Sequence, residues 1–220
     1  MKICFTGRRP KYLCGYNRDA YKPFVKDLSE LITETLLVNN EPCTFITGGA
    51  QGFDQLAFWA VDKIKRNNQN MNGLIHNKIV VPFKNQPDRW AKIGPFGRDE
   101  YEFMLSRADS IHVMHETIPH SVPKVLMDRN HVMVDESDLV IALYAQDDWQ
   151  TASGGTAECM RYAQAHNKAI LQIKYSFDEN GNLKFNREDL VKINFESLRT
   201  RNPDFDISAN YSDSELTSPT

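Results

Sequence analysis

Residues 43–55 read CTFITGGAQGFDQ and contain a complete strand, turn and helix start. The first five residues are apolar, aromatic or β-branched, which is typical of a short buried strand. The run Gly48-Gly49-Ala50-Gln51-Gly52 ends that strand in a glycine-rich turn. Apolar residues at helical spacing from Leu56 to Ile64 then predict a helix. A buried strand that leads through a glycine turn into a helix is the repeating unit of a parallel α/β sheet.

The same alternation of strand and helix recurs on both sides of this segment. Further strands are predicted at 3–5, 79–81, 111–114, 139–144 and 169–173, further helices at 24–38, 101–108, 126–134 and 159–163, and a loop at 65–77. Short apolar strands joined by helices indicate a parallel sheet that is covered on both faces, and right-handed crossovers wind it in both directions. The predicted fold class is therefore α/β: a Rossmann-like, doubly wound, mainly parallel sheet with helices on both faces.

Length and composition predict one soluble domain. The chain has 220 residues, of which 41% are hydrophobic and 25% charged, as in an ordinary globular domain. We expect a single domain at 1–200, followed by a polar and mobile tail at 201–220. The N-terminus runs directly into the first strand, so no targeting peptide is predicted. The longest apolar run, at 139–145, is too short to span a bilayer, and the expected location is the cytoplasm.

Charge and metal-ligand spacing narrow the classes of partner. The net charge is −3, so no basic excess over the whole domain indicates binding to a membrane or to nucleic acid. The four cysteines include no C-x-x-C pair and the histidines include no H-x-x-x-H pair. The adjacent Asp147 and Asp148 are expected to face water. No metal site is predicted.

Three glycine turns follow three predicted strands, at 6–9, 47–52 and 153–156. In a parallel sheet all strands end at the same edge, which is where open α/β sheets bind ligands. Glycine lets backbone N–H groups approach an anion, and the next helix presents its positive end. Arg8 and Arg9 can each hold a phosphate through two hydrogen bonds. Neither G-x-G-x-x-G nor G-x-x-x-x-G-K-[ST] occurs, so the sequence predicts phosphate binding without a standard dinucleotide or P-loop motif.

Five short motifs, in family order over about residues 1–175, resemble the SLOG superfamily and most closely its YpsA-like branch. They are Thr6-Gly7-Arg8-Arg9-Pro10, Thr47-Gly48-Gly49-Ala50-x-Gly52-x-Asp54-Gln55, Pro82-Phe83-x-Asn85-Gln86, Arg129-Asn130-x-x-Met133-Val134-Asp135-x-Ser137-Asp138 and Gly154-Gly155-Thr156. The resemblance implies a Rossmann-like fold and a nucleotide-type ligand, such as an NAD-derived or ADP-ribose-type molecule. The superfamily also includes the Lonely Guy phosphoribohydrolases and DNA-processing protein A, which binds single-stranded DNA.

The glycine turns and the resemblance together give one set of expected ligand-binding residues. They are Thr6, Gly7, Arg8, Arg9, Gly48, Gly49, Ala50, Gly52, Asp54, Pro82, Phe83, Asn130, Ser153, Gly154, Gly155 and Thr156. Asp54 stands at a helix start, where a carboxylate also serves as a cap, so both roles stay open. No cofactor beyond the nucleotide-type ligand is predicted.

The resemblance to the phosphoribohydrolases implies Glu158 and Arg129 as catalytic candidates. Arg129, Met133 and Asp138 match the spacing of the enzyme motif, but Asn130 replaces its lysine. The glycine motif before Glu158 is shorter than in the enzymes, and a displacement of about 1 Å can lower a rate on the order of a hundredfold. Glu158 could equally complement the positive end of its helix.

Three functions remain open from the sequence. The first is a binding module that senses, carries or sequesters a nucleotide derivative and, as a sensor, works with an effector protein. The second is a nucleotide N-glycosidase that uses Glu158 and Arg129. The third is single-stranded nucleic-acid binding, against which the net charge of −3 argues. A homo-oligomer is expected through Leu126 and Met133, unless that stripe belongs to the core.

Overall fold

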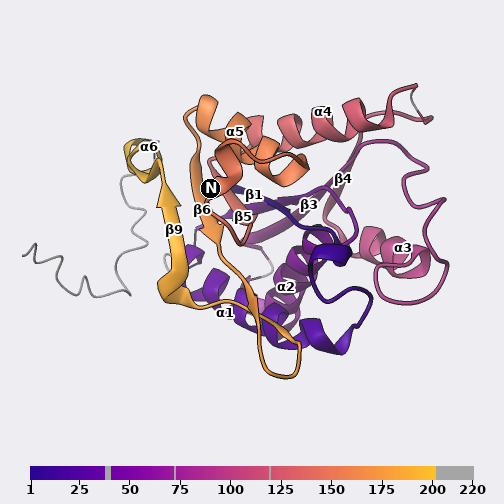
Figure 1. Ribbon diagram of the computed structural model, residues 1–220, viewed down its shortest axis with the longest axis horizontal. Helices are drawn as coiled ribbons and strands as arrows, with labels where there is room; N and C mark the ends of the chain where they lie inside the picture. Colours follow the sequence, from indigo (N-terminus) through magenta and orange to yellow (C-terminus); the bar gives the residue numbers. More distant parts are fainter. Residues whose placement is uncertain (38–40, 72, 119, 202–220) are drawn as a thin grey trace, which may run out of the picture.

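The computed structural model describes residues 1–37, 41–71, 73–118 and 120–201 (Figure 1). The main sheet of this part has seven strands in the order β4-β3-β2-β1-β5-β6-β9. They are β1 (Lys2–Gly7), β2 (Cys43–Thr47), β3 (Ile75–Val81), β4 (Ser110–Val113), β5 (Leu139–Leu143), β6 (Ala169–Ile173) and β9 (Leu190–Ile193). All neighbours pair in parallel except β6 and β9, which are antiparallel. The predicted tail at 201–220 lies outside the described residues, apart from Arg201.

Helices cover both faces of this sheet, which confirms the predicted α/β fold class. They are α1 (Lys22–Leu36), α2 (Phe53–Asn67), α3 (Arg98–Arg107), α4 (Val122–Asp135), α5 (Gly155–Ala165) and α6 (Phe195–Arg201). In Figure 1, α4 and α5 lie above the sheet and α1 and α2 below it. No helix in the described ranges is long and apolar enough to cross a bilayer.

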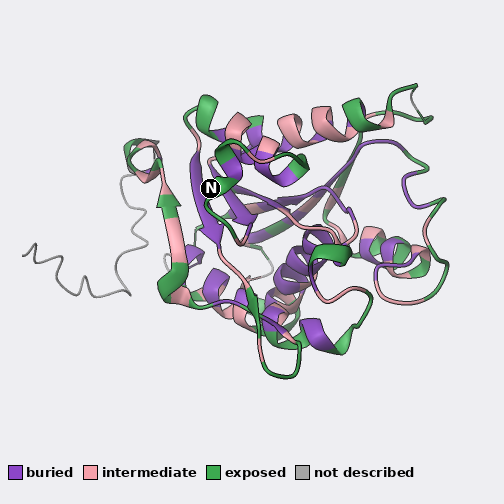
Figure 2. Cartoon of the chain, viewed as in Figure 1, coloured by how far each residue is buried: buried purple, intermediate pink, exposed green. Residues whose placement is uncertain are grey.

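Alternation along the strands divides the core between the two faces. Ile3 and Phe5 of β1 pack with α1 and α2, whereas Cys4 packs with α4 and α5. This follows from the twofold period of a strand, because successive side chains point to opposite faces. Figure 2 accordingly shows buried strands in the centre and exposed residues on the outer sides of the helices.

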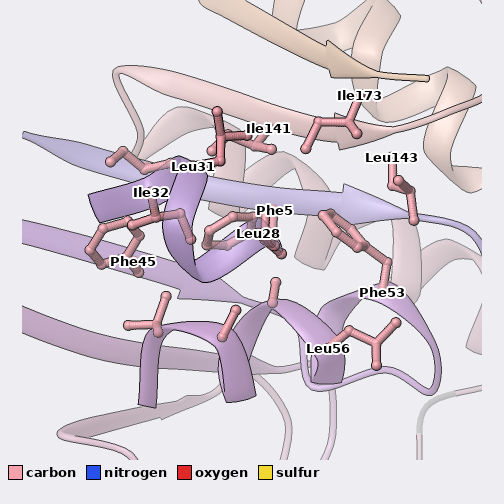
Figure 3. Close-up of a cluster of buried hydrophobic side chains, with 14 of the residues drawn as sticks. Phe5, Leu28, Leu31, Ile32, Phe45, Phe53, Leu56, Ile141, Leu143 and Ile173 are labelled. Atoms are coloured by element: carbon pink, nitrogen blue, oxygen red, sulfur yellow. The ribbon is translucent and has the colours of Figure 1, made fainter. Parts of the chain in front are cut away.

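An aromatic cluster fastens α2 under the sheet. The rings of Phe5 and Phe45 stack with centroids 6.1 Å apart, and Phe53 meets Phe5 edge to face at 6.0 Å. Phe53 is the first residue of α2 and is fully buried (Figure 3). This packing fixes the start of α2 directly beside the end of β1.

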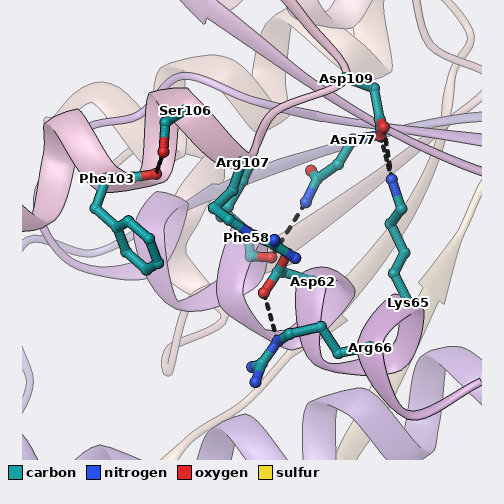
Figure 4. Close-up of polar contacts among 9 residues, drawn as sticks. All are labelled: Phe58, Asp62, Lys65, Arg66, Asn77, Phe103, Ser106, Arg107 and Asp109. Atoms are coloured by element: carbon teal, nitrogen blue, oxygen red, sulfur yellow. Dashed lines mark hydrogen bonds and ion pairs between the residues drawn. The ribbon is translucent and has the colours of Figure 1, made fainter.

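A polar cluster attaches α3 to α2 and β4 to β3 (Figure 4). The buried carboxylate of Asp62 on α2 accepts hydrogen bonds from Arg66 at 2.8 Å and from Nη2 of Arg107, at the end of α3, also at 2.8 Å. Asp109, just before β4, pairs with Lys65 at 2.6 Å and accepts the backbone N–H of Asn77 on β3 at 2.6 Å. These contacts add to the apolar packing of Tyr101 and Met104 of α3 against Phe58 of α2.

Two regions differ from the pattern expected from the sequence. The third strand begins at Ile75 rather than at residue 79. Its first half contains the polar residues His76, which is exposed, and Asn77, which is buried and donates from Nδ2 to the carbonyl of Phe58 at 3.2 Å, so no apolar run marks it in the sequence. The hairpin of β7 (Ser176–Phe177) and β8 (Leu183–Lys184), with β9, follows the last predicted strand. These elements, with two residues each in β7 and β8 and four in β9, are too short to give a periodic signal.

The strand order reverses between β1 and β5. Chain connections from β1 proceed towards β2, β3 and β4 on one side, and those from β5 proceed towards β6 on the other. Loops leaving two such neighbouring strands diverge to opposite faces, and the crevice between them is the usual ligand site of an open α/β sheet.

Candidate functional site

A cavity of about 390 Å³ lies at this reversal, where β1 ends and α5 begins. Its lining residues are Thr6, Gly7, Arg8, Arg9, Tyr12, Ala50, Asp54, Pro123, Leu126, Met127, Arg129, Asn130, Ser153, Gly154, Gly155 and Thr156. Most of the ligand-binding residues expected from the sequence are therefore brought together. The expected residues that do not line it are Gly48, Gly49, Gly52, Pro82, Phe83 and Glu158. We call this space the anion cavity, because its lining includes three arginines and one carboxylate.

The ionisable side chains lining the anion cavity are three arginines and one carboxylate. Arg8 and Arg9 come from the turn after β1, and Arg129 comes from α4 on the opposite side. The carboxylate is Asp54, in the first turn of α2. Burial lowers the pKa of Arg9, an effect that the charge of Asp54 opposes. Since arginine stays charged at neutral pH, the cavity has a net positive lining.

The guanidinium of Arg129 is fixed by a buried ion pair. Its Nη1 lies 2.8 Å from Oδ2 of Asp54, and the two residues are only 4% and 7% exposed. Gly48 makes room for this group, because a Cβ on Gly48 would lie 0.8 Å from Nη1 of Arg129. Gly48 therefore allows Arg129 to reach the cavity, although Gly48 itself does not line it.

The beginning of α5 is open for a ligand. Its first intrahelical hydrogen bond runs from Glu158 N to Gly154 O at 3.0 Å, and no side chain caps the helix at Gly154. The N–H groups of Gly155, Thr156 and Ala157 consequently have no partner inside the helix. The amide of Asn130 lies beside Gly155. Such a helix end attracts anions through its N–H groups and its dipole.

The start of α2 is different, because the protein itself occupies it. The N–H of Phe53 donates to the carbonyl of Arg8 at 3.2 Å, and the N–H of Ala50 donates to Asp54 at 3.3 Å. Gly52 has a φ of 96°, and a Cβ there would lie 2.4 Å from the same carbonyl of Arg8. The glycines of this turn therefore allow close packing against the β1 turn.

Gly49, Pro82 and Phe83 do not line the cavity. Gly49 has a φ of 65°, and a Cβ on it would lie 3.0 Å from the ring of Tyr101. Pro82 and Phe83 follow β3 and are buried.

The catalytic candidate Glu158 is paired within its own helix. Its Oε2 lies 2.7 Å from Nη2 of Arg161, and Arg161 also donates to the carbonyls of Trp149 at 2.6 Å and Ala152 at 2.8 Å. Glu158 therefore pairs with the arginine that holds the loop leading to Gly154. Arg129, the other candidate, lines the cavity and touches Asp54.

Sequence reasoning missed part of the lining. Pro123, Leu126 and Met127 lie on α4 within two turns of Arg129, so their helical spacing could have predicted them. Tyr12 ends the 3₁₀ turn Pro10–Tyr12, and only its position after the arginines hints at the site. Leu126 lines the cavity and Met133 is 1% exposed in the chain's own core, so these two residues do not form a free face for a second copy.

Arg8 stands at the outer end of the cavity between aromatic rings. Its Cζ lies 4.2 Å from the ring centroid of Tyr144 and 5.1 Å from that of Tyr12. Cation–π contacts of this kind hold a guanidinium in place while leaving its N–H groups able to bind an anion. Within the described ranges, no cluster of three or more His, Cys, Asp or Glu residues is arranged to hold a metal ion.

Comparisons with known proteins agree with the sequence motifs. The model of the YspA SLOG family (YpsA) matches residues 3–178. The uncharacterized SPbeta prophage-derived protein YoqJ of Bacillus subtilis (strain 168) is 31% identical over 149 residues, which cover 64% of this chain and 80% of YoqJ.

Two solved structures resemble the chain at low identity. DNA processing protein A (DprA) from Streptococcus pneumoniae has a TM-score of 0.47 and 15% identity, with 82% of this chain and 52% of that chain covered. The chain thus spans about half the length of the pneumococcal protein. DNA processing protein A from Helicobacter pylori, whose structure concerns the single-stranded DNA binding mode of that protein, has a TM-score of 0.48 and 16% identity, with 83% and 68% covered.

Proposed function

The chain belongs to the YspA SLOG family, and from the charges of its anion cavity we propose that it binds the phosphate groups of a nucleotide or nucleotide-derived molecule. The observation that carries this proposal is the convergence of three arginines and the uncapped start of α5 on one cavity. Asp54 offsets one of these charges, so the lining is left with an excess of two positive charges.

The two sides of the cavity favour a ligand with linked phosphates. Arg8 and Arg9 lie on the β1 side, and Arg129 lies on α4 across the cavity. A diphosphate could accept hydrogen bonds from both sides, whereas a single phosphate would reach fewer of these donors. We therefore propose ADP-ribose or NAD-type molecules as the ligand class, with the protein acting as sensor, carrier or sequestering protein.

Binding without chemistry is the favoured form of the proposal. A glycosidase needs a carboxylate that reaches the reacting sugar, but Glu158 is committed to Arg161 and does not line the cavity. The carboxylate that does line it, Asp54, is neutralised by Arg129. Neither arrangement supplies a free general base.

Isothermal titration calorimetry with ADP-ribose, NAD, AMP and inorganic phosphate tests the proposal. The variant with Arg8→Ala and Arg9→Ala should bind more weakly, by about 1.5–3 kcal/mol for each charged hydrogen bond that is lost. Arg18→Ala is the matched control, because Arg18 is exposed and pairs with Glu100 away from the cavity. Its affinity should equal that of the wild type.

Three results would contradict the proposal in different ways. Equal affinity of the double variant and the wild type would exclude the phosphate role of Arg8 and Arg9. Tighter binding of a single-stranded oligonucleotide than of any nucleotide would favour the nucleic-acid alternative. Release of free base from a nucleoside monophosphate by the wild type, abolished in Glu158→Gln, would establish the glycosidase instead.

A further inference from the structure

A second cavity, of about 420 Å³, adjoins the anion cavity and shares Arg8 and Tyr12 with it. Its other walls are Ala145 and Gln146, which follow β5, and the segment Tyr175 to Phe177, which leads into the β7–β8 hairpin. Arg8 therefore faces both spaces. A molecule anchored by phosphate at Arg8 could extend into the second cavity without a change in the fold.

The second cavity is aromatic and nearly uncharged. Tyr12 and Phe177 are 50% and 46% exposed, although each has a large apolar ring. Arg8 is the single ionisable arginine, lysine or carboxylate side chain among its lining residues. The cavity thus offers ring faces at some distance from the anion-binding groups, which suits a planar and uncharged part of a ligand.

The rings are held in place before any ligand arrives. Tyr175 donates a hydrogen bond from Oη to the carbonyl of Tyr12 at 3.0 Å, and its ring meets Phe177 edge to face at 6.0 Å. The hairpin that carries Phe177 is anchored by Leu183, which is fully buried in the core. Because these rings are ordered before a ligand binds, stacking of a ligand on them costs little conformational entropy.

Polar groups beside these rings could form hydrogen bonds to the ligand. Gln146 and Ser176 line the cavity beside the rings. The side-chain oxygen of Gln146 lies 3.5 Å from Nη2 of Arg8, a long contact that a better partner could replace. An amide and a hydroxyl beside a stacking surface are the groups that recognise the edge of a nucleobase.

From these contacts we infer that the second cavity is a base subsite, which stacks the nucleobase of the same molecule whose phosphate is held in the anion cavity. The inference rests on the proposed function and specifies it: the ligand must carry a base, and Arg8 marks the junction between base and phosphate subsites. Trp149, which is buried in the core, and Trp90, which packs on Tyr101, do not line either cavity.

Calorimetry with AMP and ribose 5-phosphate tests the base subsite, because the two probes differ only in the base. The wild type should bind AMP more tightly. Phe177→Ala should weaken AMP binding about 5- to 150-fold, the usual loss for one stacked base, and leave ribose 5-phosphate binding unchanged. Phe177→Tyr keeps an aromatic ring and should retain the AMP affinity.

Controls separate this inference from the proposed function. Phe103→Ala removes another exposed phenylalanine, 59% exposed on α3, and should have no effect on either probe. If AMP and ribose 5-phosphate bind equally and both weaken in Arg9→Ala, the base subsite is wrong but the anion cavity stands. If AMP is preferred but Phe177→Ala changes nothing, the base subsite is again wrong. If the wild type binds neither of these probes nor ADP-ribose, both proposals fall.

Discussion

The buried ion pair of Arg129 and Asp54 has a structural role and, under the proposed function, also a role in binding. Both groups are buried, and removal of one charge from such a pair leaves the other without compensation, which costs about 3–5 kcal/mol. At the same time, Asp54 occupies a guanidinium that a bound phosphate would also contact. Stability of the free protein and affinity for an anion are therefore opposed at this pair.

We predict that Asp54→Asn lowers the free energy of unfolding by about 3–5 kcal/mol, because Arg129 loses its counter-charge. The same change should tighten phosphate binding, because the carboxylate no longer competes for Arg129. Urea unfolding with and without inorganic pyrophosphate measures both effects, since a ligand that binds the folded state raises the midpoint.

The matched control is Asp19→Asn. Asp19 also pairs with a cation, Lys22, but both side chains are largely exposed, at 79% and 71%. Its replacement should leave unfolding and pyrophosphate binding nearly unchanged. An Asp54→Asn protein as stable as the wild type would show that the buried pair does not hold Arg129 in place.

At the scale of elements, a side chain of α5, Arg161, contributes to holding the loop before that helix. Arg161 joins the carbonyls of Trp149 and Ala152 to the carboxylate of Glu158. The loop then passes through Gly154, which has a φ of 111°, to the open helix start. The geometry of the anion cavity is therefore set partly by a residue outside it.

We predict that Arg161→Ala loosens this loop and weakens nucleotide binding. The free energy of local opening at 149–154 should fall by about 1.5–3 kcal/mol, the usual contribution of hydrogen bonds to a charged group. Hydrogen exchange measures the opening. Glu158→Gln is the control, because Arg161 keeps both carbonyl bonds in it and exchange at 149–154 should stay close to that of the wild type. Equal exchange in both variants would contradict the role of Arg161.

Patterns within one element were predictable from the sequence. The apolar runs of β2, β5 and β6 and the glycine turns after β1 and β2 gave the fold class, because each signal is local. The sequence also predicted that Arg8, Gly154 and their neighbours meet at one edge, since parallel strands end together.

Contacts between distant elements were not predictable in this way. The close approach of Arg129 to Gly48 depends on how α4 crosses the sheet, and no local pattern contains that information. The aromatic wall of Tyr175 and Phe177 lies on a hairpin with strands of two residues each, too short for any periodicity. The pairing of Glu158 with Arg161, in contrast, follows the i,i+3 spacing of a helix and could have been predicted.

On the scale of the whole molecule, the seven-stranded sheet takes strands from Lys2 to Ile193, and β7 and β8 form a separate two-stranded sheet. Core clusters on both faces share the strands β1, β2 and β5. A disturbance of these central strands removes the support of both helical layers at once. We therefore propose that residues 1–200 form one domain that unfolds as a unit.

We predict that urea unfolding gives a single transition whose midpoint is the same by tryptophan fluorescence and by far-ultraviolet circular dichroism. The tryptophans report on both faces, because Trp149 packs with α5 and Trp59 with α3. ADP-ribose should raise that midpoint without splitting the transition. Separate midpoints for variants that retain only Trp59 or only Trp149 would contradict a single domain.

The central place of β1 has a consequence for the newly made chain on the ribosome. β1 ends at Gly7, whereas its neighbour β5 ends at Leu143. At the usual rate of synthesis, β5 is therefore completed about 7–27 s after β1. During that interval one edge of β1 has unpaired N–H and C=O groups, which can pair with another chain. The start of α5, at Gly155, is made later still, so the lining of the anion cavity is complete only after this residue has been synthesised. The ligand proposed for this cavity would therefore bind too late to guide the early folding of β1.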